Sequence, residues 1–143
     1  MRDWRVGLAV LALLAGAATG IARAEVSCPD QLGVEQRAQA PDGWTVNDSG
    51  VAPRLATVTI FDGPPANRVS LKHDQRKQTR RELILIWRLR DTPRSHYLQC
   101  GYERTTATIS TPLPPGIGHC EVVYDLTSSY PGGAMPVKRM VCR

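Results

Sequence analysis

Four cysteines constrain this chain more than any other sequence feature. They stand at Cys28, Cys100, Cys120 and Cys142, and no two of them form a CxxC pair. An even number of widely spaced cysteines in a small exported chain is typical of disulfides, whereas zinc sites need closely spaced ligands. Two disulfides are therefore expected if the chain is exported. Three pairings stay open, and we favour Cys100–Cys120 with Cys28–Cys142, because the second bond would tie the chain ends together.

The first 24 residues have the three parts of an export signal. A short basic start precedes an uncharged apolar run from Val6 to Ala18, and Ala22-Arg23-Ala24 matches a small-x-small cleavage site. Cleavage is expected between Ala24 and Glu25. Residues 1–24 would then be the signal peptide. Residues 25–143 would form a single mature domain in the periplasm, without a stable membrane anchor.

Two alternatives to cleavage fit the sequence less well. The apolar run up to Ala22 is shorter than the roughly 20 residues that a membrane-spanning helix needs, and glycines interrupt it. A lipoprotein would need a large apolar residue ahead of its lipidated cysteine, but Glu25-Val26-Ser27 precedes Cys28. We therefore expect a soluble, exported domain.

Short β-rich runs separated by proline and glycine turns make up the mature sequence. About six short strands are expected, at residues 34–38 (or a short helix), 55–61, 83–89, 97–104, 120–124 and 137–142. The run from Leu55 to Phe61 alternates apolar and polar side chains with a period of two, as a half-buried strand does. The pattern predicts a mainly β fold, a compact antiparallel sheet or sandwich-like domain stapled by two disulfides.

The same runs predict which strands are buried. The strand at 83–89 is apolar on both faces, which predicts the most buried strand of the sheet, with Trp87 in the core. Residues 66–81 are polar and lack an apolar period, so a long surface excursion is expected there. A rigid loop is expected at 111–118, which is rich in proline and glycine. The side chains expected to face inward are Leu98, Cys100 and Tyr102 in one strand and Cys120, Val122 and Tyr124 in another.

A series of short motifs runs through the mature chain in a set order. It comprises Cys28-Pro29, Gly43-Trp44, Phe61-Asp62-Gly63-Pro64-Pro65, Trp87, Cys100-x-Tyr102 followed by Thr105, Leu113-Pro114, Cys120 and Cys142. In this order and spacing the chain resembles a family of small uncharacterised periplasmic proteins of Gram-negative bacteria. The resemblance covers nearly the whole mature chain. It implies export and the four-cysteine pattern, and it implies no particular activity.

Positive charge is concentrated between Arg68 and Arg94. Nine Lys and Arg residues lie there against three acidic residues, in a chain of formal net charge +5. From this stretch and a neighbouring turn we select a candidate interaction surface. Its members are Asp62, Lys72, Arg76, Lys77, Arg80 and Arg81. It would suit an anionic partner, either an acidic protein or an envelope component such as a lipopolysaccharide phosphate. The competing interpretation is a solvated loop that keeps a small domain soluble.

No catalytic, metal or cofactor motif stands out from the sequence. His73, His96 and His119 form no HxH or HExxH spacing, and no GxSxG is present. Asp62 stands at a strand end beside a tight turn, where catalytic acids often lie, but we favour a role in accepting backbone hydrogen bonds within that turn. Nucleic acid is not an expected partner, because the compartment is wrong and the basic stretch has no aromatic side chain before Trp87.

A non-enzymatic periplasmic binding or interaction protein is therefore the leading hypothesis for function. One specific form is an inhibitor or immunity protein that acts against an enzyme attacking the cell envelope. The alternatives are an envelope hydrolase with a scattered active site and a structural component of the envelope. A deep pocket lined by Asp62 and a histidine would favour the hydrolase.

Overall fold

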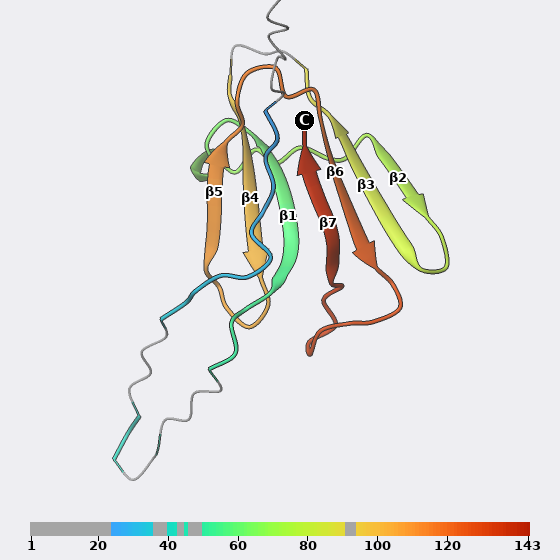
Figure 1. Cartoon of the computed structure of the whole chain (residues 1–143). Coiled ribbons are helices and arrows are strands. Elements are labelled where there is room, and N and C mark those ends of the chain that lie inside the picture. The colour runs from blue at the N-terminus through green and yellow to red at the C-terminus, as the bar shows by residue number, and fades with distance from the viewer. Residues whose placement is uncertain (1–23, 36–39, 43–44, 46–49, 91–93) are drawn as a thin grey trace, which may run out of the picture.

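Seven antiparallel strands in two sheets form the fold (Figure 1). The computed structural model describes residues 24–35, 40–42, 45, 50–90 and 94–143. One sheet has the strand order β1-β4-β5 and the other the order β2-β3-β6-β7. The elements are β1 (Leu55–Asp62), η1, a 3-10 turn (Pro65–Asn67), β2 (Gln75–Gln78), β3 (Glu82–Arg88), β4 (His96–Tyr102), β5 (Thr108–Pro112), β6 (His119–Asp125) and β7 (Val137–Cys142).

The inner faces of both sheets contribute to one hydrophobic core. Ile60 of β1, Leu98 of β4 and Val122 of β6 are fully buried in it, and Trp87 of β3 is 4% exposed. The two predicted inward-facing triplets, in β4 and β6, are all buried, so that prediction is confirmed. The mainly β, antiparallel fold class predicted from the alternating runs is confirmed as well. Residues 1–23, which hold nearly all of the predicted signal peptide, lie outside the described residues.

Several predicted elements differ from the structure. The strand or short helix expected at 34–38 lies partly outside the described residues. Its two described residues, Val34 and Glu35, belong to neither a strand nor a helix. The expected surface excursion at 66–81 contains η1 and the short strand β2, whose sequence Gln-Arg-Lys-Gln has no apolar residue to signal a strand. The expected loop at 111–118 begins with the last two residues of β5. The extra strand in the excursion extends the second sheet by one edge strand.

The prediction that 83–89 is the most buried strand was wrong. Within β3 only Leu83 and Trp87 are buried, whereas four of the seven residues of β6 are. The physical reason is the strand order. One neighbour of β3 is the short edge strand β2, whereas both neighbours of β6, β3 and β7, are longer than β2. Ile84 and Ile86, on the face of β3 away from the core, are only partly buried although they are apolar.

The disulfides pair Cys28 with Cys100 and Cys120 with Cys142. The two bonds predicted from the even cysteine count are confirmed, but the favoured pairing was wrong. Cys120 and Cys142 stand directly opposite each other in the β6–β7 ladder, so this bond lies within one sheet. Cys28 is therefore left to reach β4 of the other sheet.

An N-terminal strap, defined here as residues 26–32, connects the two sheets. Val26 exchanges two backbone hydrogen bonds with Cys142 at the edge of β7, of 3.0 and 2.8 Å. Farther along, the N–H of Leu55 donates to Asp30 O at 2.8 Å, which joins the strap to the start of β1. In Figure 1 the strap (blue) begins near the end of β7 and passes in front of β1. Val26 and Cys142 lie side by side through this backbone pairing, whereas the Cys28–Cys142 disulfide expected from the sequence is not formed.

The indole of Trp87 forms a second connection between the sheets. Segment 69–71 pairs with β1, where the N–H of Leu71 donates to Ile60 O at 2.7 Å. The Trp87 indole N–H, from β3, donates to the carbonyl oxygen of the same Leu71 at 2.9 Å. A third link comes from Tyr124 of β6, which hydrogen-bonds the backbone of Val58, while burial raises the pKa of its phenol. The two sheets are thus joined by hydrogen bonds as well as by apolar packing in the core.

Gly101 of β4 is required because another strand approaches it closely. It stands opposite Thr57 of β1, and a Cβ added at Gly101 would lie 2.2 Å from the Thr57 hydroxyl oxygen. We expect Gly101→Ala to destabilise the protein by about 1–3 kcal/mol through overpacking, measured by urea unfolding. The control is the double variant Gly101→Ala with Thr57→Ala, which removes the clashing oxygen and should recover most of the loss. Equal stability of the single and double variants would contradict this explanation.

Candidate binding surfaces

Strands β2 and β3 form a hairpin that carries most of the predicted interaction residues. The Thr79 hydroxyl orders its tip, because it accepts hydrogen bonds from the N–H groups of Arg81 (3.2 Å) and Glu82 (3.0 Å). The N–H of Thr79 in turn donates to Glu82 O at 2.9 Å. This closed turn presents Arg80 and Arg81 to solvent. We call Arg76, Lys77, Arg80 and Arg81 the basic hairpin.

The charges of the basic hairpin are not neutralised by the protein itself. All four side chains are exposed, and among the described residues none of them has an acidic partner within ion-pair distance. Glu82, at the base of the tip, is instead held by Lys138 of β7 at 2.8 Å, and this hydrogen bond raises the pKa of Lys138. The charge of Arg81 acts in the opposite direction on that pKa, since it is a nearby like charge. The hairpin tip is therefore a site of unsatisfied positive charge.

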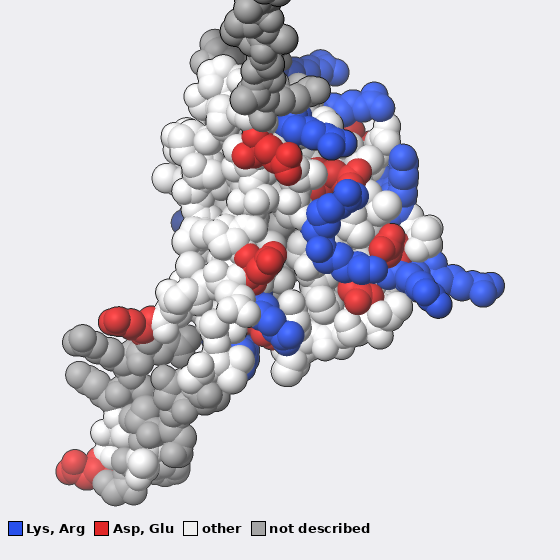
Figure 2. Space-filling model, in the orientation of Figure 1, with Lys and Arg blue, Asp and Glu red and all other residues white. Residues whose placement is uncertain are grey.

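The outer face of the four-stranded sheet continues from this hairpin. In one cross-strand row, Lys77 stands beside Ile84, Val123 and Arg139; in the next, Gln75 stands beside Ile86, Glu121 and Val141. The four apolar residues of these rows, Ile84, Ile86, Val123 and Val141, all lie outside the core cluster. Figure 2 shows the charged side chains spread over this face, with basic groups in excess. The sequence did not predict this exposed face, because the apolar residues on both faces of 83–89 indicated a strand buried on both sides.

The acidic groups of the same face are satisfied within the chain. Glu82 pairs with Lys138 and Glu121 pairs with Arg139. The Asp125 carboxylate accepts hydrogen bonds from the N–H and hydroxyl of Thr127, at 2.8 and 2.6 Å, and these bonds lower its pKa. The face therefore carries charges of both signs, and the charges without a partner within the described residues are positive.

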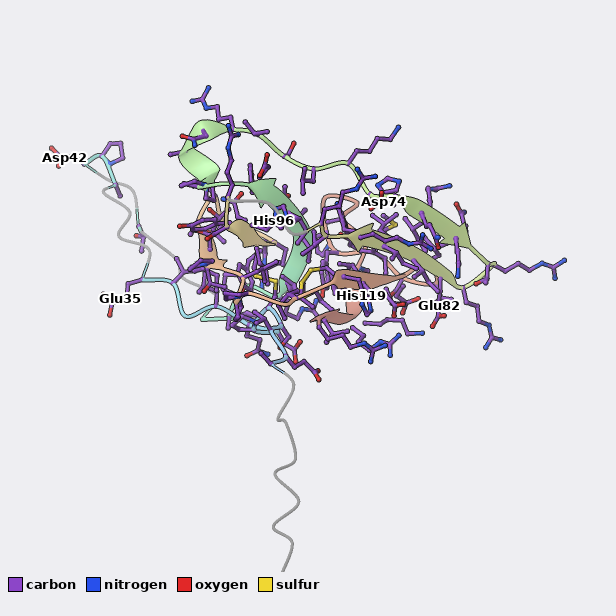
Figure 3. The ribbon with its side chains drawn as sticks, turned by 90° about the horizontal axis from the view of Figure 1, so that it is seen from above. Glu35, Asp42, Asp74, Glu82, His96 and His119 are labelled. Atoms are coloured by element: carbon purple, nitrogen blue, oxygen red, sulfur yellow. A yellow bond between two sulfur atoms is a disulfide. The ribbon has the colours of Figure 1, made fainter. Side chains whose placement is uncertain are left out.

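The remaining two predicted residues, Asp62 and Lys72, lie apart from the hairpin tip. Both line a shallow hollow of about 260 Å³ together with Arg88 and His96. This hollow is near the end of β3 opposite the tip, a strand length away. In the view from above, His96 and Asp74 lie toward one side of the molecule and Glu82 and His119 toward the other (Figure 3). The six predicted residues thus form two separate groups rather than one surface.

The carboxylate of Asp62 lies beside the side chains of Arg94 and His96 instead of the backbone of its turn. It lies 3.7 Å from Arg94 and 3.9 Å from the Nδ1 atom of His96, its cross-strand neighbour. His96 Nε2 lies 3.1 Å from the carbonyl oxygen of Arg90. Within the described residues, neither Asp62 Oδ1 nor His96 Nδ1 has a hydrogen-bond partner. The hollow is smaller than the roughly 300–1,000 Å³ of typical ligand pockets, so it is not the deep pocket expected of a hydrolase.

At the end of the other sheet, the buried carboxylate of Glu103 pairs with the half-exposed guanidinium of Arg54. Glu103 is 6% exposed, and Arg54 Nε donates to its Oε1 at 3.1 Å. The Arg54 guanidinium also lies 4.4 Å from the centre of the Tyr130 ring. Glu103 thereby fixes Arg54 over the loop between β6 and β7. This pair stabilises the fold at some distance from the hairpin.

No three His, Cys, Asp or Glu side chains among the described residues come together in a way that could hold a metal ion. No helix in this part of the chain is both long enough and apolar enough to cross a membrane.

Seven antiparallel strands in two sheets, held by two disulfides, define a small disulfide-stabilised all-β domain. Sequence comparison identifies the family to which this domain belongs. The model of the Type VI secretion system Tli immunity protein family matches residues 31–143, and the chain belongs to this family. Immunity proteins are not enzymes, so the prediction of a non-enzymatic protein is confirmed and the alternative of an envelope hydrolase was wrong.

A curated relative supports the wider resemblance inferred from the motifs. An uncharacterised 16.3 kDa protein of Azospirillum brasilense, named for its position in the trpG 5′ region, is 31% identical over 123 residues. The alignment covers 80% of this chain and 82% of the relative. No solved structure matches the chain. The resemblance to uncharacterised proteins is therefore confirmed in part, and the family adds the immunity description that the motifs alone did not imply.

Proposed function

We propose that this chain is a periplasmic immunity protein that binds and neutralises a cognate lipase toxin of the Tle type, delivered by type VI secretion. The observation that carries the proposal is the family match over residues 31–143, which includes all seven strands and both sheets. The match begins only after the predicted signal peptide. The part that resembles immunity proteins is thus the part that would remain after cleavage at Ala24.

The two disulfides support the periplasmic location. Such bonds form and persist in oxidising compartments and are rare in the cytosol of ordinary cells. The first described residues also fit cleavage at the predicted site, because the strap begins to pair at Val26. A mature chain that starts at Glu25 would therefore keep every described contact of the strap. Residues 25–143 would then act as one domain.

The experiment pairs the chain with Tle lipases encoded in the same genome. Each toxin is directed to the periplasm of a test strain, with the chain produced either whole or as residues 25–143 without the signal. We expect the whole chain to restore growth and the signal-less form to fail, because the latter stays apart from the toxin in a reducing compartment. Purified, oxidised 25–143 should abolish phospholipase activity at a one-to-one ratio.

Each part of this experiment has an outcome that counts against the proposal. If no toxin of the set binds purified 25–143, and the whole chain protects against none of them, the immunity function fails. If the signal-less form protects as well as the whole chain, the periplasmic location fails while the function stands. Mass spectrometry of the protein from periplasmic extract checks the cleavage separately, with Glu25 as the expected first residue.

A further inference from the structure

We propose that the outer face of the four-stranded sheet, bordered by Lys77, Arg80 and Arg81, is the docking surface for the toxin, and that it fits an acidic protein surface with an apolar centre. This inference rests on the proposed function and assigns it to one side of the molecule. The face extends across β2, β3, β6 and β7 and is the charged side seen in Figure 2.

The centre of the face has the composition of an interface core. Ile84 and Ile86 of β3 are partly exposed and do not contact the hydrophobic core. Val123 and Val141 continue the same cross-strand rows onto β6 and β7 but are only 6% and 8% exposed, so Ile84 and Ile86 supply the accessible apolar area. Specific interfaces commonly combine such an apolar centre with a polar rim. Residues that serve only the fold would leave this face polar, as half-buried antiparallel strands usually do.

The rim of the face has charge left for a partner. Glu82, Glu121 and Asp125 are already paired or hydrogen-bonded within the chain. Lys77, Arg80 and Arg81 have no such counter-charge among the described residues. An acidic group placed here would pair with these unpaired cations. Electrostatic complementarity of this kind raises association rates and excludes wrong partners.

A protein surface fits this arrangement better than a membrane or a second copy of the chain. The face carries the carboxylates of Glu82 and Glu121 between its cations, and these would repel a uniformly anionic lipid surface. A protein can instead match each charge with its opposite. A second copy would set one basic hairpin against another basic face, because β2 is the outermost strand of the sheet. The toxin is therefore the occupant to which the inference commits.

Neighbouring residues on β2 offer a matched test. Lys77 stands on the outer face beside Ile84, whereas Arg76 stands opposite Leu85 and points to the other side of the strand. Lys77→Glu and Arg76→Glu make the same change of charge, one residue apart, on an exposed edge strand. Arg81→Glu tests the tip, and Ile86→Thr removes apolar area from the centre while keeping a β-branched side chain.

The variants are made in oxidised 25–143, and binding to an inactivated Tle lipase is measured by surface plasmon resonance at low and high salt. We expect Lys77→Glu and Arg81→Glu each to weaken binding about tenfold, mainly through slower association, and to reduce its salt dependence. Ile86→Thr should weaken binding about tenfold through faster dissociation, whereas Arg76→Glu should change it less than about threefold. Thermal unfolding checks that all four variants remain folded.

Three results would overturn the inference. The first is that folded Lys77→Glu and Arg81→Glu bind the lipase as tightly as Arg76→Glu does. The second is that Ile86→Thr binds like the wild-type protein. The third is that the wild-type protein binds phosphatidylglycerol vesicles with the same dependence on Lys77 and Arg81, which would make the face a lipid surface. Failure of the wild-type protein to bind any lipase is a different outcome, because it removes the proposed function itself.

Discussion

Replacing Cys28 and Cys100 together by alanine is expected to lower the free energy of unfolding by about 4 kcal/mol, the largest loss expected from either disulfide. The bond closes a loop with a sequence separation of 72, whereas Cys120–Cys142 closes one of 22. In the chain-entropy treatment the longer loop constrains the unfolded chain more, so the shorter one is expected to contribute about 3 kcal/mol. For a domain whose total stability is of the order of 5–15 kcal/mol, either loss is a large fraction.

The contacts around each disulfide should increase the difference between the two losses of stability. Without its disulfide, the β6–β7 pair keeps the backbone ladder that joins Glu121 to Val141 and Val122 to Met140. The strap has only scattered hydrogen bonds to β7, to residues 53–55 and to Tyr102, so loss of Cys28–Cys100 should also free the strap locally. Hydrogen exchange should then show loss of protection at Val26 and Leu32 in this variant but little change in β6.

The matched control is the double variant Cys120→Ala with Cys142→Ala, measured in the same urea titration. Both variants remove two sulfurs and leave no unpaired thiol, so they differ mainly in which loop is opened. A smaller loss for the Cys28–Cys100 pair than for the Cys120–Cys142 pair would show that the strap contributes little to stability. The role assigned to it here would then be wrong.

Trp87→Ala is expected to destabilise the protein by about 3–5 kcal/mol, as truncation of a large buried aromatic side chain does. Trp87 is 4% exposed and belongs to the core cluster. Its loss removes core volume and also the indole hydrogen bond to Leu71, through which β3 is joined to the segment that pairs with β1. The two sheets would therefore lose a polar link as well as apolar packing.

Trp87→Phe separates these two contributions. The phenyl ring keeps most of the apolar area but has no N–H to donate, so a loss of about 1–3 kcal/mol is expected from the unsatisfied carbonyl oxygen and the smaller ring. Unfolding by urea, followed by circular dichroism, measures both variants. If Trp87→Phe were as damaging as Trp87→Ala, the indole hydrogen bond rather than the buried volume would account for the loss. If neither variant lost more than about 1 kcal/mol, the indole would not be a link between the sheets.

The sequence predicts the fold class well where side-chain pattern alone decides structure. Alternation identifies β1, β4 and β6 and the inward side chains of the last two, because one face of each strand must be buried. It fails for β2, whose four polar residues form a strand only because β3 offers an open edge. The cysteine pairing could not be predicted for a related reason, because it depends on which strands become neighbours. Strand order is a property of the whole chain, and local pattern does not contain it.

The candidate surface was predicted in part. Clustering of charge along the chain identifies the basic hairpin, but it also groups Asp62 and Lys72 with it, although the fold separates them from the tip. The apolar centre of the proposed surface was missed, since Ile84 and Ile86 could not be distinguished from core residues without knowing that β3 lies next to an edge strand. Lys138 and Arg139 were missed because their strand is near in space and distant in sequence.

The consecutive order of the disulfides has a consequence for biogenesis in the proposed periplasmic setting. A chain that emerges from its amino terminus exposes Cys28 and then Cys100 before either of the other two cysteines appears. Each thiol therefore meets its native partner as the next one to arrive. Oxidation in order of emergence yields the correct bonds directly, and the protein should mature without an isomerase to correct mispaired intermediates.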